Sequence, residues 1–124
     1  MAIEKITAPR QTPFFAETDG TIEKHRLVKV DPATNIASYE EEDANAIVIG
    51  EALPEYGNSI SYVPTGDMSR EYFLTLGGVV TRGDMLTCDA EGKGIKTEIG
   101  AEAVAQACAS GVAGQVITVR MFVL

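Results

Sequence analysis

The chain has 124 residues, of which 45% are hydrophobic, and its ten basic and eighteen acidic residues give a net charge of −8. This length suits one compact domain that can bury a core without a disulfide or a metal ion. The negative charge repels nucleic acid and anionic lipid, so we expect neither nucleic acid nor a membrane as a partner. The longest apolar runs are too short to cross a bilayer as helices, and no signal-like apolar run opens the chain, which predicts a soluble protein synthesised in the cytoplasm.

Residues 1–20 differ from the rest of the chain and are predicted to form an extended N-terminal arm. Their two prolines favour extended chain and are poorly tolerated in helices and central strands. Two adjacent phenylalanines on such a segment either fold back on the domain or dock on another chain. The expected partner-binding residues of this arm are Ile3, Ile6, Pro9, Arg10, Pro13, Phe14 and Phe15.

From Gly20 onward the sequence is typical of an all-β fold. Short runs rich in Val, Ile, Leu, Thr and Tyr alternate with clusters of Gly, Pro, Asn and Asp. Only residues 101–108, which are rich in alanine, offer a short helix as an alternative. The expected strands are 26–30, 46–53, 59–64, 72–76, 85–89, 95–98, 104–109 and 115–124.

An internal duplication of about residues 21–64 and 79–124 is indicated by three matches in the same order. Residues 22–31 match 80–89 at apolar positions 22/80, 27/85, 28/86 and 30/88, residues 49–53 match 104–108, and residues 57–62 match 114–119. Neither half is expected to close a core alone. We therefore predict that residues 21–124 form one pseudo-twofold barrel or sandwich, with residues 65–76 linking its halves.

Residues suited to catalysis or metal binding are sparse, so we expect no enzyme activity, no cofactor and no metal site. His25 is the only histidine, and no nucleophile motif accompanies it, which favours a surface histidine. Residues 92–94 are typical of a hairpin turn rather than a phosphate loop, and residues 40–43 of a solvated run of charge. The cysteines, Cys88 and Cys108, are expected to be free, buried residues that match Val30 and Leu53.

The second half of the chain resembles the capsid cement, or head decoration, proteins of tailed bacteriophages. The likeness rests on GGVVTRGDMLTCDAEGKG at residues 77–94 followed by GVAGQVITV at residues 111–119, and it extends more weakly through residues 27–30 and 49–53. Cys88, Cys108 and Ala105 depart from the usual residues of that pattern. The resemblance implies a small β-barrel or β-clip, trimers at threefold positions of the capsid, and an arm that reaches along the shell.

These observations together predict a structural virion protein that binds the outer surface of a phage capsid as a homotrimer and stabilises the shell. Its expected partners are the major capsid protein and further copies of itself. Two alternatives remain open, namely a baseplate or fibre adaptor of the virion and a small ligand- or carbohydrate-binding β module. The second alternative is disfavoured because the chain has no tryptophan and only 6% aromatic residues.

Overall fold

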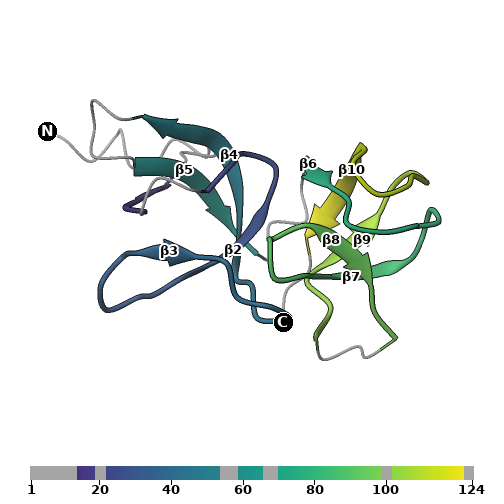
Figure 1. Cartoon of the computed structure of the whole chain (residues 1–124), viewed down its shortest axis with the longest axis horizontal. Helices are drawn as coiled ribbons and strands as arrows, with labels where there is room; N and C mark the ends of the chain where they lie inside the picture. The colour runs from purple at the N-terminus through teal and green to yellow at the C-terminus, as the bar shows by residue number, and fades with distance from the viewer. Residues whose placement is uncertain (1–13, 19–21, 54–58, 66–69, 99–101, 122–124) are drawn as a thin grey trace, which may run out of the picture.

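The computed structural model describes residues 14–18, 22–53, 59–65, 70–98 and 102–121. Figure 1 shows two lobes, the first built from the earlier strands and the second from the later ones. No helix in the described ranges is long and apolar enough to cross a membrane. The predicted all-β class is confirmed. The strands are β1 (Phe14–Ala16), β2 (Leu27–Val30), β3 (Ala37–Ser38), β4 (Ala46–Leu53), β5 (Ser59–Pro64), β6 (Glu71–Thr75), β7 (Met85–Cys88), β8 (Gly94–Lys96), β9 (Ala105–Ala107) and β10 (Val116–Met121).

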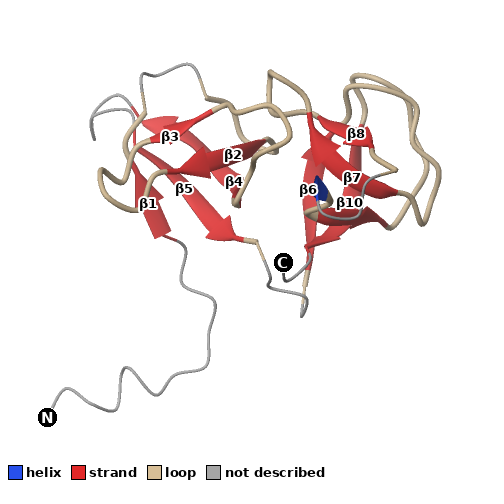
Figure 2. Ribbon diagram, turned by 90° about the horizontal axis from the view of Figure 1, so that it is seen from below, coloured by secondary structure: helices blue, strands red, loops and turns tan. Residues whose placement is uncertain are grey.

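Each lobe has its own five-stranded antiparallel sheet, in the orders β1-β5-β4-β2-β3 and β6-β10-β9-β7-β8. Of the predicted barrel or sandwich, the structure is sandwich-like and not a closed barrel, because every strand pairs within its own half. Each sheet curls until the residue after its first strand meets the start of its third strand through one isolated parallel bridge. Glu17 bridges Ile36, which directly precedes β3, and Leu76 bridges Gly94, the first residue of β8. Figure 2 shows the two sheets side by side rather than merged.

The two sheets repeat one strand order, and their registers show which residues correspond. Ala46 lies opposite Val28 in the first sheet, as Ala105 lies opposite Leu86 in the second. The first and third sequence matches agree with this correspondence, but the second is out of register by four residues. The duplication itself stays a prediction. The same strand order in both sheets is what a duplicated chain would show.

The displaced match has a local cause in β4. The pairing of β4 with β5 is irregular between Val48 and Gly50 and again between Gly50 and Leu53, whereas β9 is a short regular strand. Extra residues in one copy change the sequence offset, so the match of Cys108 with Leu53 fails. Accordingly Cys88 is buried as expected, while Cys108 is partly exposed; both are free thiols.

Two apolar clusters form the core, and the first sheet contributes to both. Val28, Val48 and Ile60 belong to a cluster made only of first-lobe residues. Leu27 and Ile47 point the other way, into the cluster formed by the second sheet. Because neighbouring side chains of a strand face opposite sides, β2 and β4 are buried on both faces. Complete burial of each such side chain contributes about 1.5–3 kcal/mol, so the contact between lobes is an integral part of the core.

The β7–β8 hairpin fixes this contact. Its turn is held internally by the Asp89 carboxylate, which accepts hydrogen bonds from the backbone N–H groups of Glu91 and Lys93, both at 2.9 Å. Gly92 then has a left-handed backbone with φ of 77°. Its carbonyl accepts a 2.7 Å hydrogen bond from the backbone N–H of Leu27 in the first lobe.

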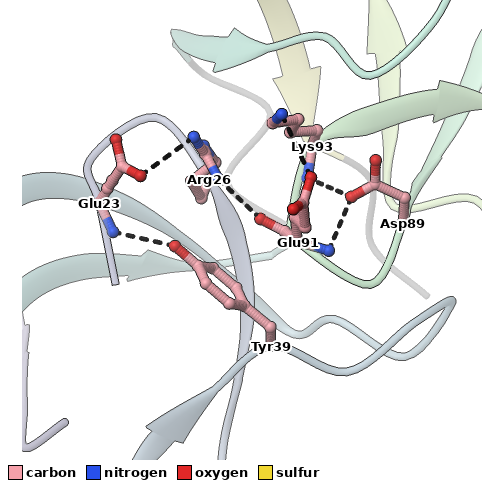
Figure 3. A network of polar contacts seen from close by, with 6 residues as sticks. All are labelled: Glu23, Arg26, Tyr39, Asp89, Glu91 and Lys93. Atoms are coloured by element: carbon pink, nitrogen blue, oxygen red, sulfur yellow. Dashed lines mark hydrogen bonds and ion pairs between the residues drawn. The ribbon is translucent and has the colours of Figure 1, made fainter. Parts of the chain in front are cut away.

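Polar side chains surround the same turn, as Figure 3 shows. The Arg26 guanidinium donates a 2.9 Å hydrogen bond to the Glu91 carbonyl and lies 3.3 Å from the Glu23 carboxylate. The Tyr39 hydroxyl accepts a hydrogen bond from the Glu23 N–H, and the Tyr39 ring lies where a side chain at Gly92 would project. The first lobe therefore encloses the turn at Gly92, where there is no room for a side chain.

We predict that Gly92→Ala destabilises the protein by about 3 kcal/mol or more. A Cβ there would lie 2.6 Å from the Leu27 carbonyl oxygen and 2.7 Å from the Tyr39 ring, in addition to the left-handed strain. Gly114→Ala is the matched control, because Gly114 has φ of 89° but nothing within 4 Å of its added Cβ. The control should lose only about 1 kcal/mol. Urea unfolding measures both changes, and equal losses would contradict the enclosed turn.

The two cysteines should differ in their reaction with a thiol reagent. Cys108 should react in the folded protein, whereas Cys88 is buried and donates a hydrogen bond from Sγ to the Glu40 carbonyl at 3.1 Å. In a Cys108→Ser background, labelling of Cys88 should require unfolding, and Cys88→Val should cost under about 1.5 kcal/mol. Rapid labelling of Cys88 in the folded Cys108→Ser protein would show that this part of the core is open.

Burial also raises the pKa of the Cys88 thiol. Stability tied to the protonated thiol is therefore fully present below about pH 9 and is lost as the pH rises through the folded pKa. Comparing the alkaline unfolding of wild type and Cys88→Val isolates this contribution, because the other titrating groups are shared. The wild type should lose stability more steeply, and parallel pH curves would contradict the assignment.

Candidate docking surfaces

The predicted partner-binding residues fall in two groups. Ile3, Ile6, Pro9, Arg10 and Pro13 lie outside the described residues. Phe14 and Phe15, expected in an arm that ends at residue 20, instead form β1 with Ala16. The boundary differs because the backbone of this segment completes the first sheet through antiparallel pairing with β5.

Both edges of the β1 segment are held, so Phe15 stands on a fixed backbone. On one side Phe15 lies opposite Ser61 in β5. On the other side the Asn35 side-chain amide donates a 3.0 Å hydrogen bond to the Phe15 carbonyl, and the N–H of Glu17 donates a 3.1 Å bond to the Asn35 carbonyl. Ala16 is buried in the first-lobe cluster. Phe15, the preceding residue of the strand, faces the opposite side and is 62% exposed.

Small residues beside Phe15 leave its ring accessible. Ser61 lies opposite Phe15 on one side and opposite Gly50 of β4 on the other. A Cβ at Gly50 would meet the Ser61 hydroxyl, so glycine at this position leaves room for that hydroxyl in its present orientation. The result is an aromatic ring next to two of the smallest residue types, an arrangement suited to an anchor that inserts into a pocket of a partner.

The second lobe holds a corresponding aromatic that sequence analysis did not single out. Phe73 in β6 lies opposite Thr118, as Phe15 lies opposite Ser61, and it is 55% exposed. The His25 ring contacts Phe73 edge to face, with ring centroids 5.6 Å apart. The sequence does contain a signal for the pair of Phe15 and Phe73, because the two residues keep the same offset as the matched positions 22 and 80. His25 thus belongs to the contact between lobes rather than to an open surface.

A polar hollow of about 400 Å³ lies between β2, β3 and the loop that precedes β4. Lys29 stands in it, and its Nζ lies 2.9 Å from the Asp43 carboxylate. That hydrogen bond and the surrounding negative charge raise the Lys29 pKa. Glu40 and Asp43 are exposed, as predicted for a solvated run of charge. Since the lysine is already paired with a carboxylate, the hollow offers little to a charged ligand.

The described part of the chain contains no group of three or more His, Cys, Asp or Glu side chains placed to hold a metal ion. Two buried polar atoms of the described residues have no hydrogen-bond partner, namely the hydroxyl oxygen Oγ1 of Thr87 and the guanidinium nitrogen Nε of Arg26. Thr87 faces the core and Arg26 lies at the contact between lobes, so the two atoms do not form one site. The chemically useful features of the described surface are therefore apolar side chains on rigid strands, which can bind a partner.

The fold defines a class of two-lobed, all-β proteins with one sheet order used twice. A solved structure with a similar fold is the crystal structure of the head fiber gp8.5 N base in bacteriophage phi29. The two chains share 16% sequence identity over 89% of this chain and 92% of that one, with a TM-score of 0.68. At this identity the likeness is one of fold. No protein-family model and no curated protein sequence matches the chain.

Proposed function

We propose that this chain is a structural protein of a tailed-phage virion that binds the outer surface of the capsid as a trimer and stabilises the shell. The observation that carries the proposal is the shared fold with a phage head-fibre base over nearly the whole of both chains. The cement-protein pattern of residues 77–94 and 111–119 supports the same setting independently. The proposal includes no catalysis, cofactor, nucleic acid or membrane.

The proposed mechanism is mechanical. The partner is the major capsid protein, which residues 1–13 and the exposed ring of Phe15 would contact from the first lobe. A trimer presents three such contacts, so each one can be weak while the assembly stays bound by avidity. The net charge of −8 also opposes binding to packaged DNA, which keeps the protein on the outer surface.

A second candidate is the base of a capsid fibre, because the structural neighbour is described as a head-fibre base. The two candidates differ in copy number. A cement protein fills many equivalent positions and raises the resistance of the shell to heat or osmotic shock, whereas a fibre base occupies few positions and has little effect on shell stability.

Adding the purified chain to expanded, undecorated shells of its phage tests the proposal. We expect saturable binding at many sites per shell, measured by gel densitometry, and a higher temperature of shell disruption. Saturation at a few sites with no stabilisation would favour the fibre base. No binding to shells or virions would overturn both candidates.

Phe15→Ala should weaken shell binding about tenfold or more, because an exposed aromatic that becomes buried on binding often contributes most of the affinity. Protein stability should change by under about 1 kcal/mol, since the ring is largely exposed already. Phe73→Ala is the control, with the same residue type at the corresponding strand position and similar exposure. Because it also removes the contact of Phe73 with His25, urea unfolding of both variants is measured beside shell binding. Equal loss in both variants would show that docking is not confined to the side of β1.

Removing residues 1–13 tests the arm separately. Every described strand begins at Phe14 or later, so the truncated chain should fold with the same β-sheet circular dichroism as the full chain. Its binding to shells should fall sharply, since the arm is proposed to supply extended-chain contacts with coat protein. Binding as tight as that of the full chain would place the docking surface on the two lobes alone.

A further inference from the structure

Two loops at the far end of the second lobe, between β6 and β7 and between β9 and β10, carry exposed apolar side chains. Residues 76–81 and 108–115 of these loops contain no Asp, Glu, Lys, Arg or His, although 23% of the whole chain is charged. The nearest charged residue along these loops is Arg82, whose backbone N–H donates a 2.9 Å hydrogen bond to Ser110 Oγ. Figure 1 shows the two loops next to each other at the end of the second lobe that faces away from the first. Valines stand out there, because Val79 is 74% exposed and Val112 is 50% exposed.

The backbone brings these valines together. Val80 and Gly111 form an antiparallel bridge with two 2.9 Å hydrogen bonds. Val79 and Val112 are the next residues on the same side of that bridge, one on each chain segment, so their backbones lie opposite each other. Val116 begins β10 one turn later, and the Gln115 side chain ties the turn by accepting a 3.0 Å hydrogen bond from the Val112 N–H. We call Val79, Val112 and Val116 the valine end; its backbone is fixed, so little ordering is needed to bind a partner.

The first half of the same chain is an internal comparison for the valine end. The corresponding positions follow from the 22/80 match and from the registers that place Ile60 and Ile117 opposite Ala16 and Leu74. By sequence, the residues of the first half aligned with the three valines are all polar, namely Thr21, Glu55 and Ser59 in that order. Ser59 is the one of these residues that the structure describes, and it begins β5 as Val116 begins β10. This strand position therefore does not require an apolar residue, and the exposed valine in the second lobe needs another cause.

We propose that the valine end is the surface through which copies of this chain contact one another in the trimer. The net charge of the chain favours a second copy over another protein as the molecule that binds the valine end. Two copies that each carry −8 repel wherever their acidic surfaces meet, so self-contact is least opposed at an apolar surface such as the valine end, whose three residues carry no charge. A coat-protein partner has no such restriction, because basic residues on it could pair with the acidic surface. The inference rests on the proposed function for the existence of the trimer.

The test exchanges the valine end for the residues of the first half. Val112→Glu alone, and Val79→Thr with Val112→Glu and Val116→Ser, should raise the dissociation constant of the trimer about 100-fold or more, because a carboxylate would be buried without a partner. Ile36→Glu is the matched control, since Ile36 is 47% exposed on the first lobe. Sedimentation equilibrium of the full chain at micromolar concentration measures all four proteins, and circular dichroism checks that each is folded.

We expect wild type and Ile36→Glu to sediment as trimers and the valine-end variants as monomers. Added salt should strengthen association of the wild type, because it screens the repulsion between acidic copies. A Val112→Glu protein that stays trimeric, or a wild type that is monomeric, would overturn the inference. The shell-binding assay is independent of this result: a monomeric wild type that still binds shells removes the self-contact and leaves the proposed function standing.

Discussion

The structure depends on the turn of the β7–β8 hairpin lying against β2. The Gly92 carbonyl receives the backbone N–H of Leu27, and Arg26 holds the neighbouring carbonyl of Glu91. The side chain of Leu27 meanwhile enters the core of the second lobe. One short stretch of β2 therefore serves two cores and also forms the polar seam between them. Two small sheets of five short strands gain from this contact the buried apolar area that each lacks alone.

The seam also determines which surfaces are left for partners. Phe73 and His25 pack together at the lobe contact, and Thr75 donates a 2.8 Å hydrogen bond to the His25 carbonyl. The outward surfaces are then β1 with Phe15 at one end of the molecule and the loops of the valine end at the other. The shared sheet order thus yields two chemically different ends, which suits a protein that must contact two different partners.

Much of the fold was predictable from the sequence because turn residues and β-branched runs are local signals. Gly92 in a predicted turn and Leu27 in a predicted strand were placed correctly for this reason, and the all-β class followed. Asp89, predicted to end a strand, instead lies in the turn after β7. Closure was not predictable, since it depends on pairing partners: residues 16 and 60 can pair with each other or across the halves with equal local propensity. The irregular pairing of β4 likewise hid the true correspondence of Cys108, because extra residues leave no sequence signature.

The candidate docking surface was only partly predictable. Paired phenylalanines among prolines indicated an exposed anchor, and Phe15 is exposed. That β1 belongs to the sheet was missed, because its three residues follow a proline and have no alternation long enough to detect. Phe73 was missed since it lies in an ordinary strand pattern, and its exposure follows from the position of β6 at an edge of its sheet.

The unequal sharing of core residues has a consequence for synthesis of the chain. The first-lobe cluster lies entirely between Ala16 and Ile60, so it can assemble before the later residues leave the ribosome. The second cluster takes Leu27, Ala44, Ile47 and Val63 from the first lobe and is incomplete without them. The early lobe thus acts as the surface on which the later one is completed. Until then Leu27 and Ile47 face water, and a chain that pauses after residue 64 is at its most prone to aggregate.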